Sequence, residues 1–435
     1  ESRGLGDVYK RQEYSMKNKI LTGLLLVLIG GWGSLSAQSA GSNYARQVNT
    51  LIGTKGVGLT SGYLYPGATY PYGMVQFTPS YFSKRSGFVI NQLSGGGCEH
   101  MGNFPTFPVK GKLKMSPDNI LNYRINISEE KGHAGYYEAK VQEDIHAKLT
   151  VTERTGMASY EYPADQQYGT VIIGGGISAT PIEQAAIVIT APNKCEGYAE
   201  GGNFCGLRTP YKVYFVAEFD TDALESGTWK RDELKPNTTF AEGEYSGVYF
   251  TFDVNKKKNI QYKIGVSYVS VENARENLKA ENTGWDFLQI QNQAESKWNH
   301  YLGKIEVEGT NPDRTTQFYT HLYRSFIHPN VCSDVNGEYM GADFKVHKSR
   351  SKHYTSFSNW DTYRTQIQLL SILDPEVASD IVISHQLFAE EAGGAFPRWV
   401  MANIETGVMQ GDPTPILISN AYAFGARNYD PKPIF

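Results

Sequence analysis

The amino-acid sequence predicts an N-terminal antiparallel β-sandwich followed by a helical domain. Hydrophobic and polar residues alternate with a period of two from about Asn43 to Val271, which is typical of half-buried strands. After Val271 the hydrophobic residues recur at helical spacing instead. Hydrophobic residues make up 40% and charged residues 20% of the 435-residue chain, as in ordinary soluble globular proteins. The predicted fold class is therefore β first and α second.

The alternation is clearest in three segments of the predicted sandwich, at residues 213–219, 248–254 and 260–268. Each segment carries apolar residues at every second position, and turn-rich pieces such as Gly201–Asn203 separate such segments. Many antiparallel strands of this kind are typical of a large β-sandwich, which we place at residues 41–272. The residues expected to point into its core are Val248, Phe250, Phe252, Ile260 and Ile264.

Helices are predicted in the rest of the chain. Thr283–Asp286 has the spacing of a capping box, and the apolar residues from Phe287 to Tyr301 then follow a helical period within a helical linker at residues 273–310. The other predicted helices, in a domain at residues 311–435, are Asp313–Ile327, Asp361–Leu373, Pro375–Glu391 and Pro413–Ala426. A helical domain this small looks unfinished beside such a sandwich.

The N-terminal segment predicts export. Met16–Lys19 is basic, Ile20–Ile29 is apolar and small residues follow up to Ala40, so residues 16–40 are predicted to be a secretory signal peptide. Residues 1–15 precede it as an upstream extension without structure. The apolar stretch is too short for a comfortable transmembrane helix, so we expect no integral membrane segment in the mature chain. The expected location is the periplasm, the cell surface or the medium of a bacterium.

Charge and cysteine content bear on two other classes of protein. Lysine plus arginine is 41 and aspartate plus glutamate is 45, with no long basic run, so no nucleic-acid partner is expected. The four cysteines are Cys98, Cys195, Cys205 and Cys332. They allow three pairings, and a Cys195–Cys205 pair would close a short loop. No Cys-x-x-Cys or His-x-x-x-His spacing suggests zinc.

Several motifs follow one another along the chain. Val48–Thr54 and Tyr65–Gln76 form an N-terminal signature, and Gly95–Cys98 is a glycine-rich loop. The later motifs are His328–Asn330, Ser333–Gly337, Trp360–Arg364, Glu405–Asp412 and Asn420–Tyr422. As a set and in this order, they resemble glycoside hydrolase family 92, the exo-α-mannosidases.

The resemblance implies a β-sandwich packed on an (α/α)6 barrel, with the active site between them. It implies a calcium-dependent, inverting enzyme that removes terminal α-linked mannose, with Ca2+ as cofactor and a mannose-containing glycan as substrate. It places the general acid and the base beyond Phe435, so residues 311–435 would be a partial, truncated (α/α)6 catalytic domain and this chain alone would be inactive. The loop after Cys98 lacks the family's Trp, so no linkage preference carries over.

The predicted substrate-binding residues are Gly97, Cys98, Trp360, Asp361, Arg364, Glu405 and Asp412. Asp361 could accept sugar hydroxyls in short charge-assisted bonds, but Ser358 and Asp361 also have the spacing of a capping box. Gly97 and Cys98 could bring backbone amides close to a ligand or could form a tight turn. His100, a lone histidine in a loop, is expected to be a polar surface group.

The other candidates also have structural alternatives. Trp360 could stack on a sugar or fill the core. Arg364 could pair with a carboxylate in the pocket or balance an acidic neighbour one turn away. Asp412-Pro413 has the residue types favoured at the N-cap and first position of a helix. Glu405, in a predicted loop, is either a site residue or a solvated or salt-bridged glutamate. The residues expected to converge on one cleft are Gly97, Cys98, Asp361 and Glu405.

Three functions fit these motifs. The first is an exported exo-acting α-mannosidase, whose inversion needs an acid and a base about 6.5–9.5 Å apart with a water between them. The second is a non-catalytic surface glycan-binding protein. The third is another inverting glycosidase, or a phosphorylase, with the same sandwich-plus-barrel plan. Release of mannose from mannobiose separates the first from the second, and a phosphate requirement would favour the third.

Overall fold

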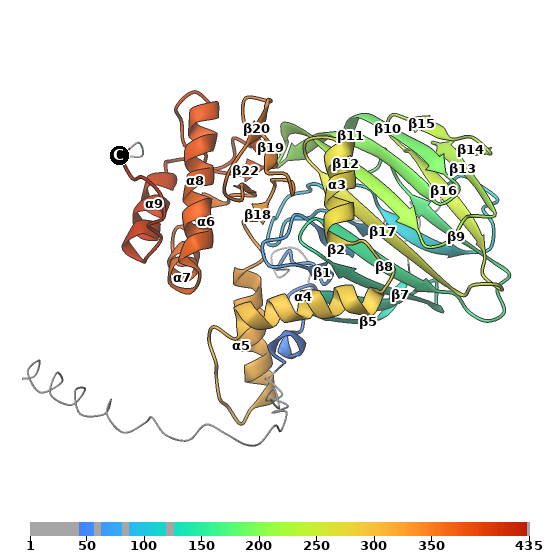
Figure 1. Ribbon diagram of the computed structural model, residues 1–435, viewed down its shortest axis with the longest axis horizontal. Helices are drawn as coiled ribbons and strands as arrows, with labels where there is room; N and C mark the ends of the chain where they lie inside the picture. Colours follow the sequence, from blue (N-terminus) through green and yellow to red (C-terminus); the bar gives the residue numbers. More distant parts are fainter. Residues whose placement is uncertain (1–42, 56–61, 81–86, 119–125, 433–435) are drawn as a thin grey trace, which may run out of the picture. The chain divides into compact units, whose positions relative to one another are not determined.

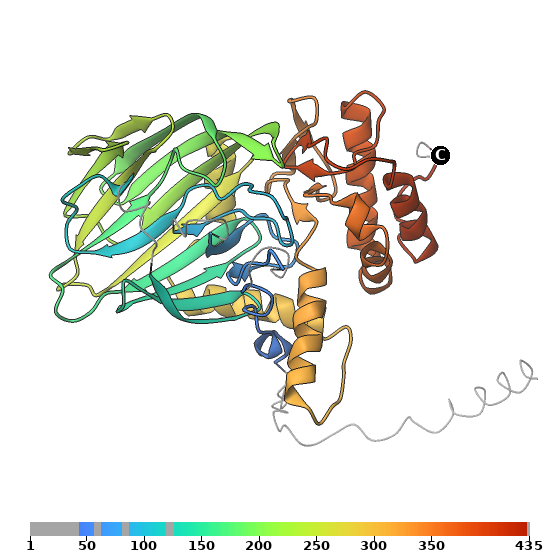
Figure 2. The same ribbon diagram turned by 180° about the vertical axis from the view of Figure 1, so that it is seen from behind.

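The computed structural model describes residues 43–55, 62–80, 87–118 and 126–432. In these residues two antiparallel sheets come first and helices follow (Figures 1 and 2). The first sheet has eight strands, in the spatial order β1 (Ala68–Thr69), β2 (Gln76–Pro79), β3 (Phe88–Val89), β4 (Thr106–Lys110), β9 (Tyr168–Ile173), β16 (Ser246–Asp253), β13 (Glu225–Lys230) and β14 (Glu233–Pro236). The second has nine, in the order β15 (Phe240–Glu242), β10 (Ile182–Ala191), β11 (Lys194–Phe204), β12 (Leu207–Phe219), β17 (Asn259–Ser267), β8 (Thr155–Glu161), β7 (Ile145–Val151), β6 (Tyr136–Val141) and β5 (Ile127–His133). The predicted sandwich is confirmed.

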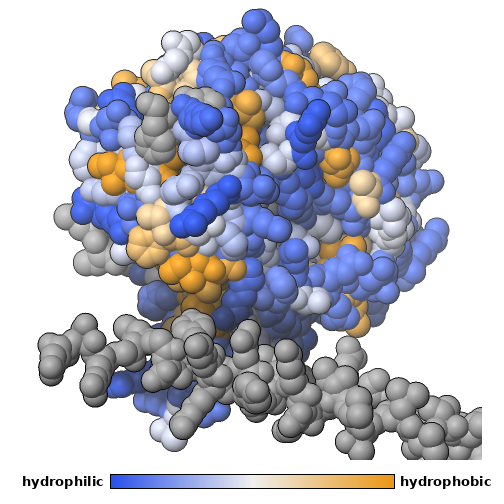
Figure 3. Space-filling model, turned by 60° about the vertical axis from the view of Figure 1, so that its left-hand side comes forward, coloured by the Kyte–Doolittle hydropathy of each residue, from blue (hydrophilic) through white to orange (hydrophobic). Residues whose placement is uncertain are grey.

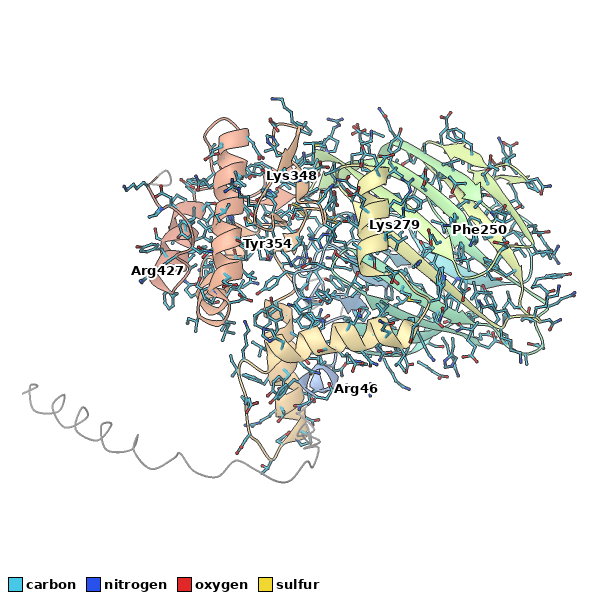
Figure 4. All side chains as sticks on the ribbon, viewed as in Figure 1. Arg46, Phe250, Lys279, Lys348, Tyr354 and Arg427 are labelled. Atoms are coloured by element: carbon cyan, nitrogen blue, oxygen red, sulfur yellow. A yellow bond between two sulfur atoms is a disulfide. The ribbon has the colours of Figure 1, made fainter. Side chains whose placement is uncertain are left out.

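The core of the sandwich lies between the two sheets, where Figure 4 labels Phe250. The residues predicted to point inward are all buried, at 1% exposure or less: Val248, Phe250, Phe252, Ile260 and Ile264. The expectation that only one face of each strand is buried is wrong for β16, because Tyr249 and Thr251 on its other face are buried too. The Thr251 hydroxyl lies 2.8 Å from the hydroxyl of Thr170 on β9, so its polar atom is satisfied.

Helix α3 (Val271–Glu281) covers part of the outer face of the nine-stranded sheet. Gly265 of β17 permits this close packing, because a Cβ there would lie 2.5 Å from the backbone oxygen of Ala274. Val216 of β12 packs with Ala274 and Leu278 in a small core of their own. Both faces of β17 are therefore covered at this point, which explains why the alternation of burial fades along it.

The other helices are α4 (Phe287–Leu302), α5 (Pro312–Ser325), α6 (Asn359–Thr362), α7 (Gln366–Leu373), α8 (Pro375–Glu391) and α9 (Thr414–Ala423), with a 3-10 turn η1 (Tyr44–Gln47) at the start. Helix α8 has the predicted bounds because the Asp374 side chain accepts from Val377 N and Pro375 suits the first turn. Helix α4 begins after Asp286, whose side chain accepts from Gln289 N. The capping box that was expected to begin at Thr283 is therefore wrong.

The single helix predicted over residues 361–373 is broken into α6 and α7. The break leaves the backbone oxygen of Tyr363 without a helical partner, and two side chains donate to it instead. The amide groups of Gln368 and Asn420 each lie 3.0 Å from this oxygen. At the start of α7, the amide of Gln366 donates to the backbone oxygen of His328 at 3.0 Å. Tertiary contacts of this kind override the local helical pattern.

Three short antiparallel pairs lie near the junction of the sandwich and the helices (Figure 1). They are β18 (Asn330–Val331) with β21 (Tyr354–Thr355), β19 (Glu338–Met340) with β20 (Val346–Lys348), and β22 (Val400–Met401) with β23 (Ile404–Glu405). Tyr354, labelled in Figure 4, connects the first pair to α8, because its backbone N–H donates to the hydroxyl of Ser384 at 3.0 Å.

The N-terminal signature binds the sandwich to the helices. The indole N–H of Trp298 on α4 donates to the backbone oxygen of Thr69 at 2.7 Å. The backbone N–H of Tyr72 donates to the oxygen of Phe326 at 2.8 Å. The guanidinium of Arg324 on α5 donates to the oxygen of Thr50 at 2.8 Å. These bonds connect residues far apart in sequence, so the signature serves as a structural joint.

One disulfide joins Cys98 to Cys205, and Cys195 and Cys332 are free and buried. The suggested Cys195–Cys205 pair is therefore wrong, because Cys195 lies within β11 and belongs to the sandwich core. The predicted signal peptide and upstream extension lie outside the described residues. No helix in the described part is long and apolar enough to cross a membrane. The face seen in Figure 3 is mostly hydrophilic, with apolar side chains in small groups.

Candidate functional site

The glycine-rich loop Leu93–Cys98 connects β3 to β4 and is fixed at both of its sides. The disulfide ties Cys98 to the tip of the β11–β12 hairpin at Cys205. The backbone N–H of Gly95 donates to the oxygen of Tyr63 at 2.9 Å. Gly97 is exposed and lies beside the Tyr63 ring, where an added Cβ would stand 3.8 Å from the nearest ring carbon. The loop therefore presents its backbone to the surface at Gly97.

Two imidazoles hold the start of this loop. The backbone N–H of Leu93 donates to Nε2 of His100 at 2.8 Å, and that of Ser94 donates to Nε2 of His328 at 2.8 Å. His100 is only 1% exposed, so the expectation of a surface histidine is wrong. Burial lowers the pKa of His100 and the pKa of His328 to about 4. Both rings are therefore neutral at pH 7.

The tip of the β11–β12 hairpin bridges the loop and the helical part. Cys205 and Gly206 make its turn with left-handed backbone, at φ values of 52° and 85°. The Phe204 ring packs on Trp399, with ring centroids 4.3 Å apart. Leu207 lies beside Gly407, where an added Cβ would be 3.5 Å from Leu207 Cδ1. The hairpin tip thus places the loop next to the segment around residues 399–407.

Glu405 uses its carboxylate to hold that segment together. One oxygen accepts from the backbone N–H groups of Arg398 at 2.7 Å and Trp399 at 3.2 Å, and the other accepts from Gly407 at 3.0 Å. The predicted loop around Glu405 is the end of strand β23, where Glu405 pairs with Val400. Three backbone donors on one carboxylate indicate a structural role that orients Trp399.

Asp361 lies in α6 and is exposed. The hydroxyl of Ser358 donates to its carboxylate. Ser358 makes no side-chain hydrogen bond to the start of the helix, so the capping-box alternative is wrong in this structure. Ser358 also pairs with Trp399 in an isolated antiparallel bridge. Asp361 is therefore positioned by a neighbour of Trp399 and keeps an accessible carboxylate.

The remaining candidates lie around the same helix start. Trp360 is partly buried, and its indole nitrogen is buried without a hydrogen-bond partner among the described residues. Gly411 faces the Trp360 ring, where an added Cβ would lie 3.5 Å from Cζ2. Arg364 is exposed, with its guanidinium carbon 5.2 Å from the centroid of the Tyr363 ring. Within the described part of the chain it forms no ion pair.

Asp412 is exposed and precedes α9. The N-cap of α9 is Pro413 and no side chain caps it, so the structural alternative in which Asp412 caps this helix is wrong. The start of α9 is fixed instead by Thr414, whose hydroxyl donates to the backbone oxygen of Pro397 and accepts from the Asn359 amide at 2.8 Å. Thr414 thus ties the start of α9 to the segment before it without capping the helix, and the carboxylate of Asp412 stays at the surface.

These contacts form a continuous path across the candidate site. It runs from Cys98 through Cys205 and Phe204 to Trp399, and from Trp399 to Glu405 and to Ser358 beside Asp361. The structure therefore brings the glycine-rich loop, the start of α6 and the β22–β23 hairpin together. Sequence reasoning missed Tyr63, Phe204 and Trp399. Phe204 directly precedes Cys205, which is a signal for that residue, whereas nothing in the neighbouring sequence marks Tyr63 or Trp399.

The predicted Ca2+ finds no ligand set among the residues described. No group of three or more His, Cys, Asp or Glu in this part of the chain could hold a metal ion. Ca2+ takes six to eight oxygen ligands, whereas the carboxylates of Asp361 and Glu405 bind a serine hydroxyl and backbone amides. No ligand of Ca2+ is therefore assigned to a described side chain.

Comparisons with known proteins show the family to which the two parts of the chain are similar. The glycosyl hydrolase family 92 N-terminal domain matches residues 47–267, and the glycosyl hydrolase family 92 catalytic domain matches residues 273–435. A protein of Arthroderma benhamiae named as an uncharacterized secreted glycosidase is 26% identical over 363 residues, which are 74% of this chain and 45% of that protein.

Two solved structures from Bacteroides thetaiotaomicron share the fold. A family GH92 alpha-mannosidase superposes with a TM-score of 0.82 at 24% identity, covering 90% of this chain and 56% of its own. A family GH92 inverting mannosidase superposes with a TM-score of 0.78 at 25% identity, covering 90% and 54%. The chain spans about half the length of these relatives.

Proposed function

Because the chain belongs to glycosyl hydrolase family 92, we propose that the protein is an exported, exo-acting α-mannosidase that removes terminal α-linked mannose from glycans with inversion. The relatives named as an alpha-mannosidase, an inverting mannosidase and a secreted glycosidase support the substrate, the stereochemistry and the export. In this proposal the segments around Gly97, Trp360 and Asp361 hold the terminal sugar.

One observation carries the proposal. The exposed backbone of Gly97, the accessible carboxylate of Asp361 and the partly buried ring of Trp360 belong to segments that the path through Cys205, Phe204 and Trp399 joins. Asp361 and Gly97 supply what a sugar ring needs, because a carboxylate accepts from hydroxyls in charge-assisted bonds and a glycine allows close approach to backbone. The indole nitrogen of Trp360 is buried, so in this proposal Trp360 contributes its ring and not a hydrogen bond.

Glu405 has a different task in this proposal. An inverting glycosidase needs one carboxyl group that gives a proton and one that activates water, about 6.5–9.5 Å apart. Glu405 is engaged by three backbone N–H groups, so we assign it to positioning Trp399 and not to proton transfer. Asp361 we assign to binding sugar hydroxyls. The acid and the base are therefore not assigned to any described residue.

Calcium dependence remains part of the proposal for the complete active site. A hard cation of this kind would bind sugar hydroxyls together with protein oxygens. The sugar contacts proposed for Gly97 and Asp361 are made by the protein directly, and removal of calcium tests whether they depend on the ion.

Binding of mannose by this chain tests the proposal. We expect a methyl α-mannoside titration, followed by ligand-observed NMR, to give a dissociation constant of about 1–10 mM, as suits a monosaccharide held by a few hydrogen bonds. Asp361→Asn should weaken binding at least about tenfold, the cost of one charge-assisted bond. The matched control is Asp222→Asn, an exposed aspartate in the β12–β13 connection. Absence of binding by the unchanged chain, or equal binding by Asp361→Asn, would overturn the proposal.

A further inference from the structure

The loop Leu93–Cys98 is closed by one imidazole at both of its ends. Nε2 of His100 receives the backbone N–H of Leu93 at 2.8 Å, and Nδ1 of the same ring lies 2.7 Å from the backbone oxygen of Cys98. The ring is packed between the loop and the hairpin tip. An added Cβ at Gly96 would lie 2.8 Å from its Cε1, and the Phe204 ring centroid is 6.0 Å away.

A second imidazole reaches the same loop from the helical part. Nε2 of His328 receives the backbone N–H of Ser94 at 2.8 Å, across 234 positions of sequence. Nδ1 of His328 lies 2.6 Å from Oδ1 of Asn330. The amide nitrogen of Asn330 donates to the backbone oxygens of Gly73 and Ile327, at 2.9 Å each. Adjacent backbone amides of the loop, at Leu93 and Ser94, are thus held by two different rings.

Only one protonation state of each ring satisfies all of these bonds. A backbone N–H can only donate, so Nε2 of His100 and of His328 must each carry a lone pair. The oxygen of Cys98 can only accept, so Nδ1 of His100 carries the proton. The amide nitrogen of Asn330 already donates to two oxygens, so its Oδ1 accepts from Nδ1 of His328. Both rings are therefore neutral and protonated on Nδ1.

We propose that His100 and His328 are the positioning residues of the Leu93–Cys98 loop, and that they hold it only in this neutral form. A proton added to either Nε2 would turn an acceptor into a donor that faces a backbone N–H. The bond to Leu93 or to Ser94 would be lost, and the loop would open at its start. The same loop presents Gly97, so the statement that the loop binds a sugar rests on the proposed function. The statement that the two imidazoles hold the loop does not.

The surroundings of the rings set the pH range. Burial lowers the pKa of both imidazoles to about 4, from an ordinary value of 6.5. His100 and Arg324 of α5 both act on His328 and oppose a further positive charge on its ring. For His100, burial is the largest influence and it lowers the pKa. When the loop opens, the pKa of each imidazole returns to its ordinary value, and the ring takes up a proton more readily. Opening is therefore favoured as pH falls from 6.5 towards 4. Between pH 7 and pH 5 the opening constant should rise about 20-fold for each imidazole.

Hydrogen exchange of the full chain measures this opening. Protection factors, which correct for the pH dependence of intrinsic exchange, are followed for the peptide that contains Leu93 and Ser94 between pH 7 and pH 4.5. If both rings take up a proton on opening, the opening constant should rise by about two powers of ten per pH unit at the steepest point. Peptides from the core strand β16 should keep their protection over the same range, which separates loop opening from unfolding.

Glutamine variants supply the decisive comparison, because glutamine offers an acceptor oxygen that does not titrate. His100→Gln and His328→Gln should each reduce the pH dependence to about one power of ten per unit, and the double variant should abolish it. His328→Phe removes the acceptor and should lower protection of Ser94 even at pH 7. His146→Gln, on the exposed side of β7, is the matched control and should retain the full dependence. An unchanged pH dependence in the glutamine variants would overturn the proposal.

Mannoside titration of the same variants separates this proposal from the proposed function. If the loop opens as described and no variant or wild-type chain binds methyl α-mannoside at any pH, the proposed function fails and the positioning role stands. If the wild-type chain binds the sugar at pH 7 but loop protection is independent of pH, the positioning role fails and the proposed function stands. If both hold, binding should weaken in wild type at pH 5 and should not weaken in the double glutamine variant.

Discussion

Removal of the Cys98–Cys205 disulfide perturbs the region around the candidate site. The bond joins residues that are 107 positions apart. In the chain-entropy account, a cross-link of this span removes about 5 kcal/mol of loop-closure entropy from the unfolded state at 25 °C. Contacts such as Phe204 on Trp399 do not require the bond. We therefore expect Cys98→Ala/Cys205→Ala to lose about 3–5 kcal/mol of unfolding free energy.

Urea denaturation followed by tryptophan fluorescence, with and without TCEP, measures this loss. TCEP should lower the free energy of unfolding of the wild type to that of the Cys98→Ala/Cys205→Ala variant. The variant itself should not respond to TCEP. The matched control is Cys195→Ala/Cys332→Ala, which removes the two free buried thiols. It should lose about 1 kcal/mol per site through small cavities and keep the full response to TCEP.

Two outcomes would refute the reasoning. A response to TCEP that disappears in the Cys195→Ala/Cys332→Ala variant would show a different pairing. A loss below about 1 kcal/mol in the Cys98→Ala/Cys205→Ala variant would show that the bond constrains the unfolded chain very little, so that the hairpin contacts alone fix the loop.

Three further predictions concern single side chains and the metal. Burial raises the pKa of Glu295, but hydrogen bonds from His133, Gln291 and Arg46 lower it to about 2, so its stabilisation is present above pH 4.5 and is lost as pH falls through 2. Urea titrations should show Glu295→Gln about 2 kcal/mol less stable at pH 7 and nearly equal to wild type at pH 2. Release of mannose from α-mannobiose should not be abolished by Glu405→Gln, because the Glu405 carboxylate is engaged by three backbone N–H groups; loss of release in this variant would show that Glu405 is a working acid. EDTA should leave methyl α-mannoside binding unchanged, and a loss of binding would reveal a calcium site.

The sandwich could be predicted from the sequence because its signal is local. Period-two alternation shows which residues of a strand share a face, and Phe250 and Ile264 lie in the core as expected. The bounds of α8 were predictable for the same reason, since Asp374 and Pro375 are start signals within one turn. The break between α6 and α7 was not, because it depends on side chains such as Asn420 that arrive from elsewhere to satisfy a freed carbonyl.

The candidate site was predictable as a set of segments but not as a set of contacts. The order of the motifs indicated that the glycine-rich loop and the Trp360–Arg364 segment belong to one family pattern. Nothing local indicated that Cys98 would pair with Cys205, because a cross-link of that span is decided by which hairpin tip the fold brings to the loop. The contact between Phe204 and Trp399 has the same origin.

The motif residues divide into two kinds, and the division follows from where their polar atoms point. His100, His328 and Glu405 direct theirs at backbone N–H groups of the chain itself. Asp361 and Gly97 leave theirs accessible. In helices and strands the spacing of residues shows which way a side chain points, but loops have no such regular spacing. The sequence of a motif in a loop therefore cannot show whether a side chain faces the protein or the solvent. Substitutions of His100, His328 or Glu405 should alter loop geometry at every pH where the ring or carboxylate acts. Substitutions of Asp361 or Gly97 should alter sugar binding and leave the free energy of unfolding within about 0.5 kcal/mol of the wild type.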